Sequence, residues 1–264
     1  MTASPASLSE LDDFFRSVAS AAPRLLLLDY DGTLAPFREA RDEAVPYPGV
    51  RERVEALARA PHTRVVVVSG RSVSDLRPLL GVEPPPEIWG THGWERYRPG
   101  RGLDLVDPGT REREGLEEAR ARAREVAPAG AVEVKPASVA VHVRGLPEAR
   151  RQEVTAAARR VWEDEAEASG LEIHDFDGGV ELRVPGRDKG TAVREILAEE
   201  PEEAVVAYLG DDWTDEDAFR ALEGRGLRVL VRTRWRESCA DAWIRPPDEL
   251  LAFLDRWNSA ATGE

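Results

Sequence analysis

The sequence has a single cysteine, Cys239, so no disulfide bond can form within the chain. Secreted domains are commonly held by disulfides, whereas cytosolic proteins keep their thiols reduced. The N-terminal segment MTASPASLSELDD lacks the basic and apolar regions of a secretory signal peptide. No apolar run approaches the ~20 residues that a membrane-spanning helix needs. These absences lead us to expect a cytoplasmic protein with no membrane partner.

Lysine is almost absent, because Lys135 and Lys189 are the two lysines among 36 basic residues and arginine supplies the rest. The 50 acidic residues give a formal net charge of -14. A field of this sign repels nucleic acid, so we expect no nucleic-acid partner. It also repels anionic small molecules, so any phosphate site must be neutralised locally. Each lysine either stands where it does by chance or marks a place that needs a compact ammonium group instead of a planar guanidinium group.

What is present is an alternation of short apolar runs and amphipathic segments in a chain of 264 residues, long enough to bury a core. The apolar runs predict strands at Leu25–Asp29, Arg64–Ser69, Glu87–Gly93 (a strand or a turn), Ala204–Gly210, Leu227–Val231 and Ala242–Ile244. Helices are predicted at Ser7–Ser20, Pro48–Ala60, Ser72–Leu80 and from Thr214 onward. This alternation predicts an α/β fold with a Rossmann-like doubly wound parallel sheet.

The middle of the chain has a different order of elements. Helices are predicted at Thr110–Ala127 and Pro147–Ser169, and strands in the segments 131–136, 138–145, 171–177 and 179–185. Two strands, a helix and two strands joined by short turns indicate a separate antiparallel layer. Glycine and proline cluster on both sides of it, in RPGRGLDLVDPG and VPGRDKG, as hinges would. We therefore predict an α/β core of residues 1–108 and 187–264 that is interrupted by an inserted α+β cap of residues 109–186.

The predicted cap strands separate into an apolar and a charged face, because alternate residues of a strand share a face. The apolar face holds Val132, Val134, Val139, Val141, Val143, Val180, Leu182 and Val184. The charged face holds Glu133, Lys135, His142, Arg144, Glu181 and Arg183. For any one strand, exposure to solvent explains the charges, but several neighbouring strands bring mixed charges to one face. Such a surface can form hydrogen bonds with many hydroxyl groups.

Polar clusters follow the core strands and open the helix after the cap. They are Asp29-Tyr30-Asp31-Gly32-Thr33, Ser69-Gly70-Arg71, Asp188-Lys189-Gly190 and Gly210-Asp211-Asp212, which continues to Asp217. Ligands of open α/β sheets bind beyond the carboxyl ends of the strands, where these clusters converge. Helix capping by Ser72, Asp188 and Thr214 explains single clusters equally well. It does not explain all of them together.

The residue types in these clusters suit phosphate chemistry. Aspartates at two strand ends form the oxygen-rich site that Mg²⁺ prefers, and a serine, a lysine and helix amides offer donors to phosphate oxygens. A carboxylate beside a metal and a lysine can attack phosphorus and form an aspartyl-phosphate. A second carboxylate two residues further on can protonate the leaving oxygen and then activate water.

In order along the chain, the clusters resemble the motifs of the haloacid-dehalogenase-like phosphatases. Longer runs narrow the resemblance to the trehalose-6-phosphate phosphatase family, over roughly residues 24–219. These runs are Ser69-Gly70-Arg71, Thr91-His92-Gly93, the segment from Glu133 to Arg144, the segment from Glu181 to Gly190, and GDDWTDEDAF at Gly210–Phe219.

The resemblance implies a role for each matching residue. Asp29 is implied to be the nucleophile and Asp31 the general acid and then base. Asp29, Asp211 and the backbone carbonyl of Asp31 are implied to hold Mg²⁺. Asp212 and Asp215 are implied to lie in or near the metal shell, and Ser69 and Lys189 to bind the phosphoryl group. The residues implied to contact the disaccharide are Glu133, Lys135, Arg144 and Glu181. Those implied to act where cap and core meet are Arg71, His92 and Gly93.

The implied function is Mg²⁺-dependent hydrolysis of trehalose 6-phosphate in trehalose biosynthesis, by a monomer whose partner is a small sugar phosphate. One alternative is a phosphatase of another glycosyl phosphate, such as that of sucrose, glucosylglycerol or mannosylglycerate. A phosphomutase and a non-catalytic module that regulates a sugar synthase are further alternatives. The set of charged cap residues favours trehalose, and the intact catalytic set disfavours the regulatory module.

Overall fold

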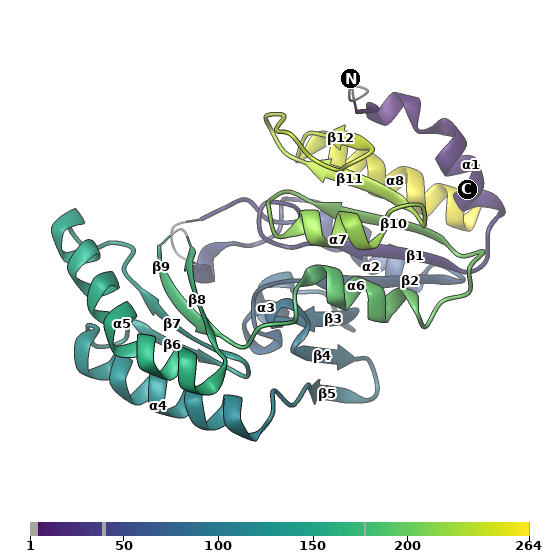
Figure 1. Cartoon of the computed structure of the whole chain (residues 1–264). Coiled ribbons are helices and arrows are strands. Elements are labelled where there is room, and N and C mark those ends of the chain that lie inside the picture. Colours follow the sequence, from purple (N-terminus) through teal and green to yellow (C-terminus); the bar gives the residue numbers. More distant parts are fainter. Residues whose placement is uncertain (1–4, 39–40, 177, 264) are drawn as a thin grey trace. The chain divides into compact units, whose positions relative to one another are not determined.

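The computed structural model describes residues 5–38, 41–176 and 178–263. The chain divides into two compact units (Figure 1). Met1–Asp104 with Asp188–Glu264 form the first, here called the core unit, and Leu105–Arg187 form the second, the inserted unit. That the inserted unit acts as a substrate-reading cap stays a prediction. Among the described residues, no helix combines the length and the apolar character needed to cross a membrane.

The core unit is built on an eight-stranded sheet in the order β12-β11-β10-β1-β2-β3-β4-β5. Its strands are β1 Arg24–Leu28, β2 Thr63–Val68, β3 Glu87–Gly90, β4 Glu95–Arg98, β5 Gly102–Leu105, β10 Val205–Gly210, β11 Leu227–Val231 and β12 Ala242–Ile244. The strands from β12 to β3 pair in parallel, and β4 pairs with β3 antiparallel. The predicted α/β class with a mostly parallel sheet is thus confirmed.

Helices cover both faces of this sheet. They are α1 Asp12–Ser20, α2 Val50–Arg59, α3 Val73–Leu80, α6 Lys189–Leu197, α7 Asp215–Ala221 and α8 Asp248–Thr262, with short 3-10 helices η1 Leu8–Glu10, η2 Arg41–Glu43 and η3 Thr91–Gly93. Leu26 and Leu28 of β1 pack into the core cluster with α1, α2, α3 and α8, while Leu25 and Leu27 pack with α6 and α7. Burial on both faces explains why β1 is a continuous run of leucines.

Some elements of the core unit differ from the prediction. The first predicted helix is two elements, because Ser7 caps η1 in a capping box with Glu10 and α1 begins at Asp12. The sequence patterns predicted no element at β4, β5 or α8. The two strands are short, charged and partly exposed, so their pattern is weak. In contrast, α8 buries Leu250, Phe253, Leu254 and Trp257, a helical spacing that was readable in the sequence.

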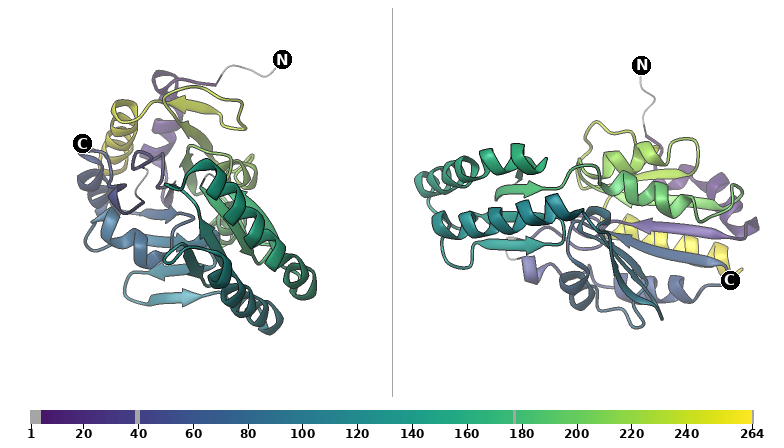
Figure 2. Two further views of the ribbon diagram at one scale, coloured as in Figure 1. Left: turned by 90° about the vertical axis from the view of Figure 1, so that its left-hand side faces the viewer. Right: turned by 60° about the horizontal axis from the view of Figure 1, so that its bottom comes forward.

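The inserted unit combines a four-stranded antiparallel sheet, in the order β6-β7-β9-β8, with two helices. Its elements are α4 Thr110–Val126, β6 Val132–Lys135, β7 Ser138–His142, α5 Glu148–Ser169, β8 Glu172–Phe176 and β9 Gly179–Arg183; residue 177 of the predicted third strand lies outside the described residues. The two helices lie side by side along the sheet (Figure 2). Buried Trp162 of α5 donates its Nε1–H to the carbonyl oxygen of Ala119 in α4, at 2.9 Å.

Most residues of the predicted apolar face are buried against these helices, including Val139, Val141, Val180 and Leu182. Val134 is an exception, since it is 45% exposed. It lies on β6, which is an edge strand of the sheet. The alternation of residues fixes which face a side chain shares, but not how far the helices extend over an edge strand.

Candidate active site

Strand β1 delivers Asp29 to the carboxyl edge of the core sheet. The amide of Asp29 donates to the carbonyl oxygen of Leu209 in β10 at 2.9 Å, and the residue is 2% exposed. The chain turns at Gly32, whose φ is +89°. A Cβ atom there would lie 2.2 Å from Oδ2 of Asp211, so only glycine fits. This turn lets the two aspartate-bearing loops approach each other closely.

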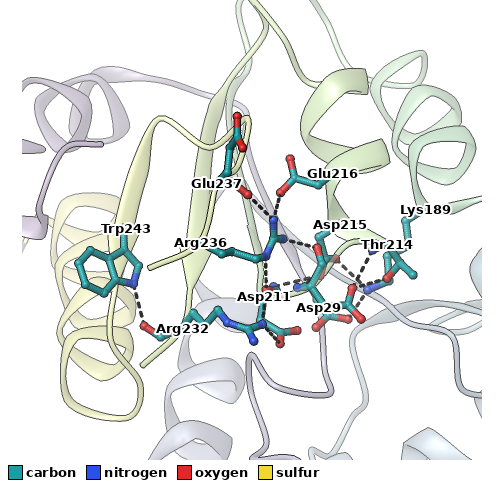
Figure 3. Close-up of polar contacts among 11 residues, drawn as sticks. Asp29, Lys189, Asp211, Thr214, Asp215, Glu216, Arg232, Arg236, Glu237 and Trp243 are labelled. Carbon is teal, nitrogen blue, oxygen red and sulfur yellow. Dashed lines mark hydrogen bonds and ion pairs between the residues drawn. The ribbon is translucent and has the colours of Figure 1, made fainter. Parts of the chain in front are cut away.

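Lys189 connects two of the buried carboxylates (Figure 3). Its Nζ donates to Oδ1 of Asp29 at 2.7 Å and to Oδ1 of Asp215 at 2.8 Å. Burial lowers the pKa of Lys189, but the charges of Asp215 and Asp29 outweigh it and hold this pKa well above its usual range. The ammonium group is therefore charged. The predicted cap at the start of α6 is confirmed, since the Asp188 side chain accepts from the Thr191 amide.

Asp215 organises the loop that follows β10. Its Oδ2 accepts the amides of Asp211 and Asp212, both at 3.0 Å, and its Oδ1 accepts the hydroxyl of Tyr208 at 2.6 Å as well as Lys189. Thr214 occupies the predicted N-cap position, since α7 begins at Asp215, but its side chain makes no capping hydrogen bond. Thr214 instead donates its amide and hydroxyl to Oδ1 of Asp212, at 2.8 and 2.7 Å.

Within the described residues, two buried carboxylate oxygens have no hydrogen-bond partner, Oδ2 of Asp29 and Oδ1 of Asp211. Burial, then the charges of Asp29 and Asp215, raises the pKa of Asp211 to about 10. Burial and Asp215 also raise the pKa of Asp29, although Lys189 opposes the shift. Asp29, Asp211 and Asp215 each offer an oxygen within 4.8 Å of the others. A hard divalent cation fits these donors, because it would bind the unpartnered oxygens and stabilise the ionised carboxylates.

The side chains of two other expected metal residues are occupied elsewhere. The oxygens of Asp31 accept from Nε and Nη2 of Arg71, both at 2.6 Å. Oδ1 of Asp212 accepts both the amide and the hydroxyl of Thr214, and Oδ2 takes no part in these two hydrogen bonds. The role implied for Asp31 at the metal runs through its backbone carbonyl, which this ion pair leaves unaffected. The metal roles of Asp31 and Asp212 stay predictions.

The turn after β2 packs against the short helix η3. The hydroxyl of Ser69 accepts the amide of Arg71 at 3.1 Å, and the carbonyl oxygen of Ser69 accepts the amide of His92 at 3.0 Å. Thr91 and His92 have φ values of 47° and 54°, in the left-handed region that costs energy for residues with side chains. A Cβ on Gly70 would lie 2.6 Å from Nε2 of His92. The expected residues Ser69, Arg71, His92 and Gly93 are therefore neighbours.

Two arginines that no sequence pattern predicted follow β11 and reach the same loop (Figure 3). Arg236 donates from Nη2 to the carbonyl oxygen of Asp212 at 2.6 Å and pairs with Glu216 at 2.5 Å. Arg232 donates from Nη1 to the carbonyl oxygen of Asp211 at 3.2 Å. No motif marks these arginines. Their place after a parallel strand is the one signal that could have singled them out.

In the inserted unit, the structure brings together charged residues of the predicted open face. Nζ of Lys135 lies 3.6 Å from Glu181 and 3.9 Å from Glu133. Ser138 donates its hydroxyl to Glu181 at 2.7 Å, and Nε2 of His142 lies 2.6 Å from Oε2 of Glu133. The fourth expected sugar-binding residue, Arg144, lies against the backbone of Gly178, where a Cβ would be 3.1 Å from Arg144 Nε.

Comparison with known proteins identifies related sequences. The profile of a family described as trehalose-phosphatase matches residues 27–239. A bifunctional trehalose-6-phosphate synthase/phosphatase of Thermoproteus tenax is 37% identical over 226 residues, covering 84% of this chain and 30% of the relative. A trehalose-phosphate phosphatase of Mycobacterium marinum is 31% identical over 240 residues, covering 85% of this chain and 59% of the relative. The chain thus spans less than two thirds of the length of either relative.

Solved structures show the same fold. A trehalose-6-phosphate phosphatase structure from Aspergillus fumigatus, crystal form 2, superposes with a TM-score of 0.66 at 24% identity. The match covers 97% of this chain and 100% of that chain. At this identity the similarity establishes a shared fold, in agreement with the mostly parallel α/β sheet of the core unit.

Proposed function

Because the chain belongs to the trehalose-phosphatase family, we propose that it is a Mg²⁺-dependent phosphatase that converts trehalose 6-phosphate to trehalose and phosphate. The observation that carries this proposal is the buried contact of Asp29 with Lys189, beside carboxylate oxygens that have no partner in the described part of the chain. A nucleophilic carboxylate, a fixed cation and hard oxygen donors are the parts that phosphoryl transfer requires.

We assign the metal to the carboxylates of Asp29 and Asp211, with the Asp31 carbonyl and Asp212 as further contributors. When bound, Mg²⁺ neutralises charge on the phosphoryl group, which an acidic protein otherwise repels. Asp215 suits a supporting role better than direct binding, because both of its oxygens already accept hydrogen bonds. It holds Lys189 and the Asp211–Asp212 backbone in place.

Asp29 acts as the nucleophile in this proposal. One of its carboxylate oxygens attacks phosphorus, the bond from phosphorus to the sugar oxygen breaks, and an aspartyl-phosphate forms. Lys189 and the hydroxyl of Ser69 donate to the phosphoryl oxygens and stabilise their charge. The burial of Asp29 and Lys189 strengthens this stabilisation, because water does not screen it.

Asp31 acts first as an acid and then as a base. It gives a proton to the leaving sugar oxygen, and it later takes a proton from the water that attacks phosphorus, releasing phosphate and restoring Asp29. Both of its oxygens now accept hydrogen bonds from Arg71. Each oxygen has a second acceptor site, so Asp31 can carry the proton while Arg71 holds its carboxyl group in place. We assign Arg71, with His92 and Gly93 beside it, to holding Asp31 and contacting the substrate.

The disaccharide is assigned to the charged face of the inserted unit. Glu133, Lys135, Arg144 and Glu181 carry ionised groups, which form stronger hydrogen bonds to hydroxyls than neutral groups do. Lys135 lies beyond hydrogen-bond distance from both glutamates, 3.6 and 3.9 Å, so its ammonium group has capacity for sugar hydroxyls. This face is proposed to read the sugar, and the core unit to perform the chemistry.

A panel of sugar phosphates tests the proposal by phosphate release in the presence of Mg²⁺. We expect trehalose 6-phosphate to give the highest kcat/KM, above the phosphates of sucrose, glucosylglycerol and mannosylglycerate. A higher kcat/KM for another sugar phosphate would make that compound the proposed substrate, and the phosphatase reaction would still stand. Release from no member would contradict the enzyme proposal and favour the regulatory module.

A further inference from the structure

The backbone of the loop after β10 is held mainly by Asp215 and Arg236, with one further hydrogen bond from Nη1 of Arg232 to the carbonyl oxygen of Asp211 at 3.2 Å. The Asp215 carboxylate accepts the amide N–H groups of Asp211 and Asp212, both at 3.0 Å. The guanidinium group of Arg236 donates to their carbonyl oxygens, at 3.4 Å for Asp211 and 2.6 Å for Asp212. The backbone N–H and C=O groups of Asp211 and Asp212 therefore all have hydrogen-bond partners. Figure 3 shows Arg236 reaching this loop from the segment that follows β11.

Arg236 is itself held in one place. Its side chain is 12% exposed and pairs with Glu216, whose side chain is 4% exposed, at 2.5 Å. Glu216 also accepts the amide of Cys239 at 2.9 Å. The guanidinium group lies over the ring of Trp213, 4.5 Å from its centroid. An arginine that is paired with a carboxylate and stacked on an aromatic ring has few alternative positions, so its bonds to the two carbonyls are well defined.

We propose that Arg236 is a positioning residue for the divalent cation, because it fixes the backbone of Asp211 and so directs the buried Asp211 carboxylate. This inference rests on the proposed function, which places the cation at Asp211. In the described part of the chain, Oδ1 of Asp211 has no hydrogen-bond partner, and Oδ2 is 3.8 Å from Arg232, too far for a hydrogen bond. The backbone therefore sets the direction of this carboxylate.

A rival explanation is that Arg236 only anchors the segment 232–241 between β11 and β12. The chain offers a matched control, because Arg228 anchors the other end of this segment. Its Nε and Nη2 donate to Asp241, at 3.0 and 2.6 Å. Weakening that contact loosens the same segment and leaves the bonds from Arg236 to the Asp211 loop in place. The two arginines thus separate anchoring from positioning.

Titration of the full chain with MgCl₂, without substrate and followed by calorimetry, tests the inference. Arg236→Lys keeps a positive charge beside Glu216, but an ammonium group on a shorter reach cannot bond both carbonyls in the same geometry. Residues that support metal ligands typically change metal affinity about 10- to 100-fold when mutated. We expect the Mg²⁺ Kd to rise by about 10-fold or more in Arg236→Lys and to stay at the wild-type value in Arg228→Lys.

Wild-type affinity in Arg236→Lys would overturn the inference, and so would an equal loss in Arg228→Lys. The unfolding temperature of each variant checks that it is folded. If the lysine variant does not fold, Arg236→Gln, which retains one amide donor, must show the loss instead. A wild-type chain that binds no Mg²⁺ would overturn the proposed metal site together with this inference. The behaviour of the Arg236 variant thus tests the inference alone, whereas Mg²⁺ binding by the wild type tests the proposed function.

Discussion

Lys189 and Lys135 both lie between carboxylates, but in different ways. In the core unit, Lys189 is 4% exposed and donates to Asp29 and Asp215 at 2.7 and 2.8 Å. In the inserted unit, the Lys135 side chain is 12% exposed and lies 3.6 and 3.9 Å from Glu181 and Glu133. Lys189 therefore forms direct hydrogen bonds, whereas Lys135 lies at ion-pair distance, beyond the range of a hydrogen bond.

Under the proposed function, this difference separates a fixed catalytic lysine from an adaptable sugar-binding lysine. A buried lysine bonded to two carboxylates is preorganised, and it needs no rearrangement when charge develops on a phosphoryl group. A partly exposed lysine with looser contacts can exchange them for hydroxyl groups at little cost. We therefore expect changes at the first site to affect turnover and changes at the second to affect substrate binding.

Of the changes that test this comparison, Lys189→Arg has the largest expected effect. A planar guanidinium group cannot replace a compact ammonium group between Asp29 and Asp215 without displacing them. We expect kcat for trehalose 6-phosphate to fall by about 10²-fold or more, the loss seen when one preorganised donor is removed. Steady-state phosphate release measures it. Turnover near that of the wild type would contradict the phosphate role proposed for Lys189.

Lys135→Arg is the matched change in the inserted unit, with a smaller expected effect. Loss of one charge-assisted hydrogen bond to a sugar hydroxyl raises KM by about 10-fold, and kcat stays close to the wild-type value. The same phosphate assay, run across a range of substrate concentrations, separates the two constants. A fall in kcat as large as that of Lys189→Arg would contradict the claim that Lys135 acts in substrate binding and not in turnover.

The metal-free core is expected to lose stability as pH rises. Burial, with Asp29 and Asp215, raises the pKa of Asp211 to about 10, whereas an unfolded aspartate titrates near ~3.9. Between these values the folded state binds more protons than the unfolded state. The stabilisation is fully present below the unfolded pKa and is lost as pH rises through the folded pKa.

Denaturant unfolding in EDTA measures this dependence. Between roughly pH 6 and pH 9 we expect a downward slope of at most about 1.4 kcal/mol per pH unit from this group. Asp211→Asn should reduce the slope, since asparagine does not titrate, and saturating Mg²⁺ should reduce it in the wild type. An identical slope in wild type and variant would exclude Asp211 as its source.

The smallest effect is expected at Glu199, which belongs to a charged network away from these lysines. Arg96 and Arg64 donate to it at 2.6 and 2.8 Å, and these hydrogen bonds lower the pKa of Glu199 to about 2 against a smaller effect of burial. Its stabilisation is present above the unfolded pKa of ~4.3 and is lost as pH falls toward about 2.

Because the Glu199 side chain is 40% exposed, solvent screens this network. We expect Glu199→Gln to lower the free energy of unfolding at neutral pH by less than ~1 kcal/mol and to leave kcat unchanged. Glu202→Gln, in the exposed turn nearby, is the control. A larger loss, or any loss of turnover, would show that exposed and buried charge networks of this protein are not separable.

Local patterns predicted the parts of the site that depend on short stretches of sequence. The run of leucines indicated a strand buried on both faces, which β1 is. The carboxyl ends of parallel strands explain why Asp29, Ser69 and Asp211 belong to one edge of the core sheet. Asp188 was predicted as an N-cap from its residue type and position alone, and the structure confirms it.

What the sequence left open depends on contacts between distant segments. Nothing near Arg236 indicates that its side chain bonds the carbonyl oxygens of Asp211 and Asp212, because the path of the segment after β11 decides this. The choice of Asp215 as the organising carboxylate follows from its burial beside Tyr208. Exposure of Val134 follows from the edge position of β6, which requires knowledge of the strand order.

The most direct test of the account is phosphate release from trehalose 6-phosphate by the wild-type chain and by Asp29→Asn, each with saturating Mg²⁺. Asparagine keeps the shape of the side chain and removes the nucleophilic carboxylate, and the unfolding temperature of the variant verifies its fold. We predict turnover by the wild type and a loss of more than ~10³-fold in the variant, as for other covalent nucleophiles. Full turnover by Asp29→Asn would contradict the central claim that Asp29 forms the aspartyl-phosphate.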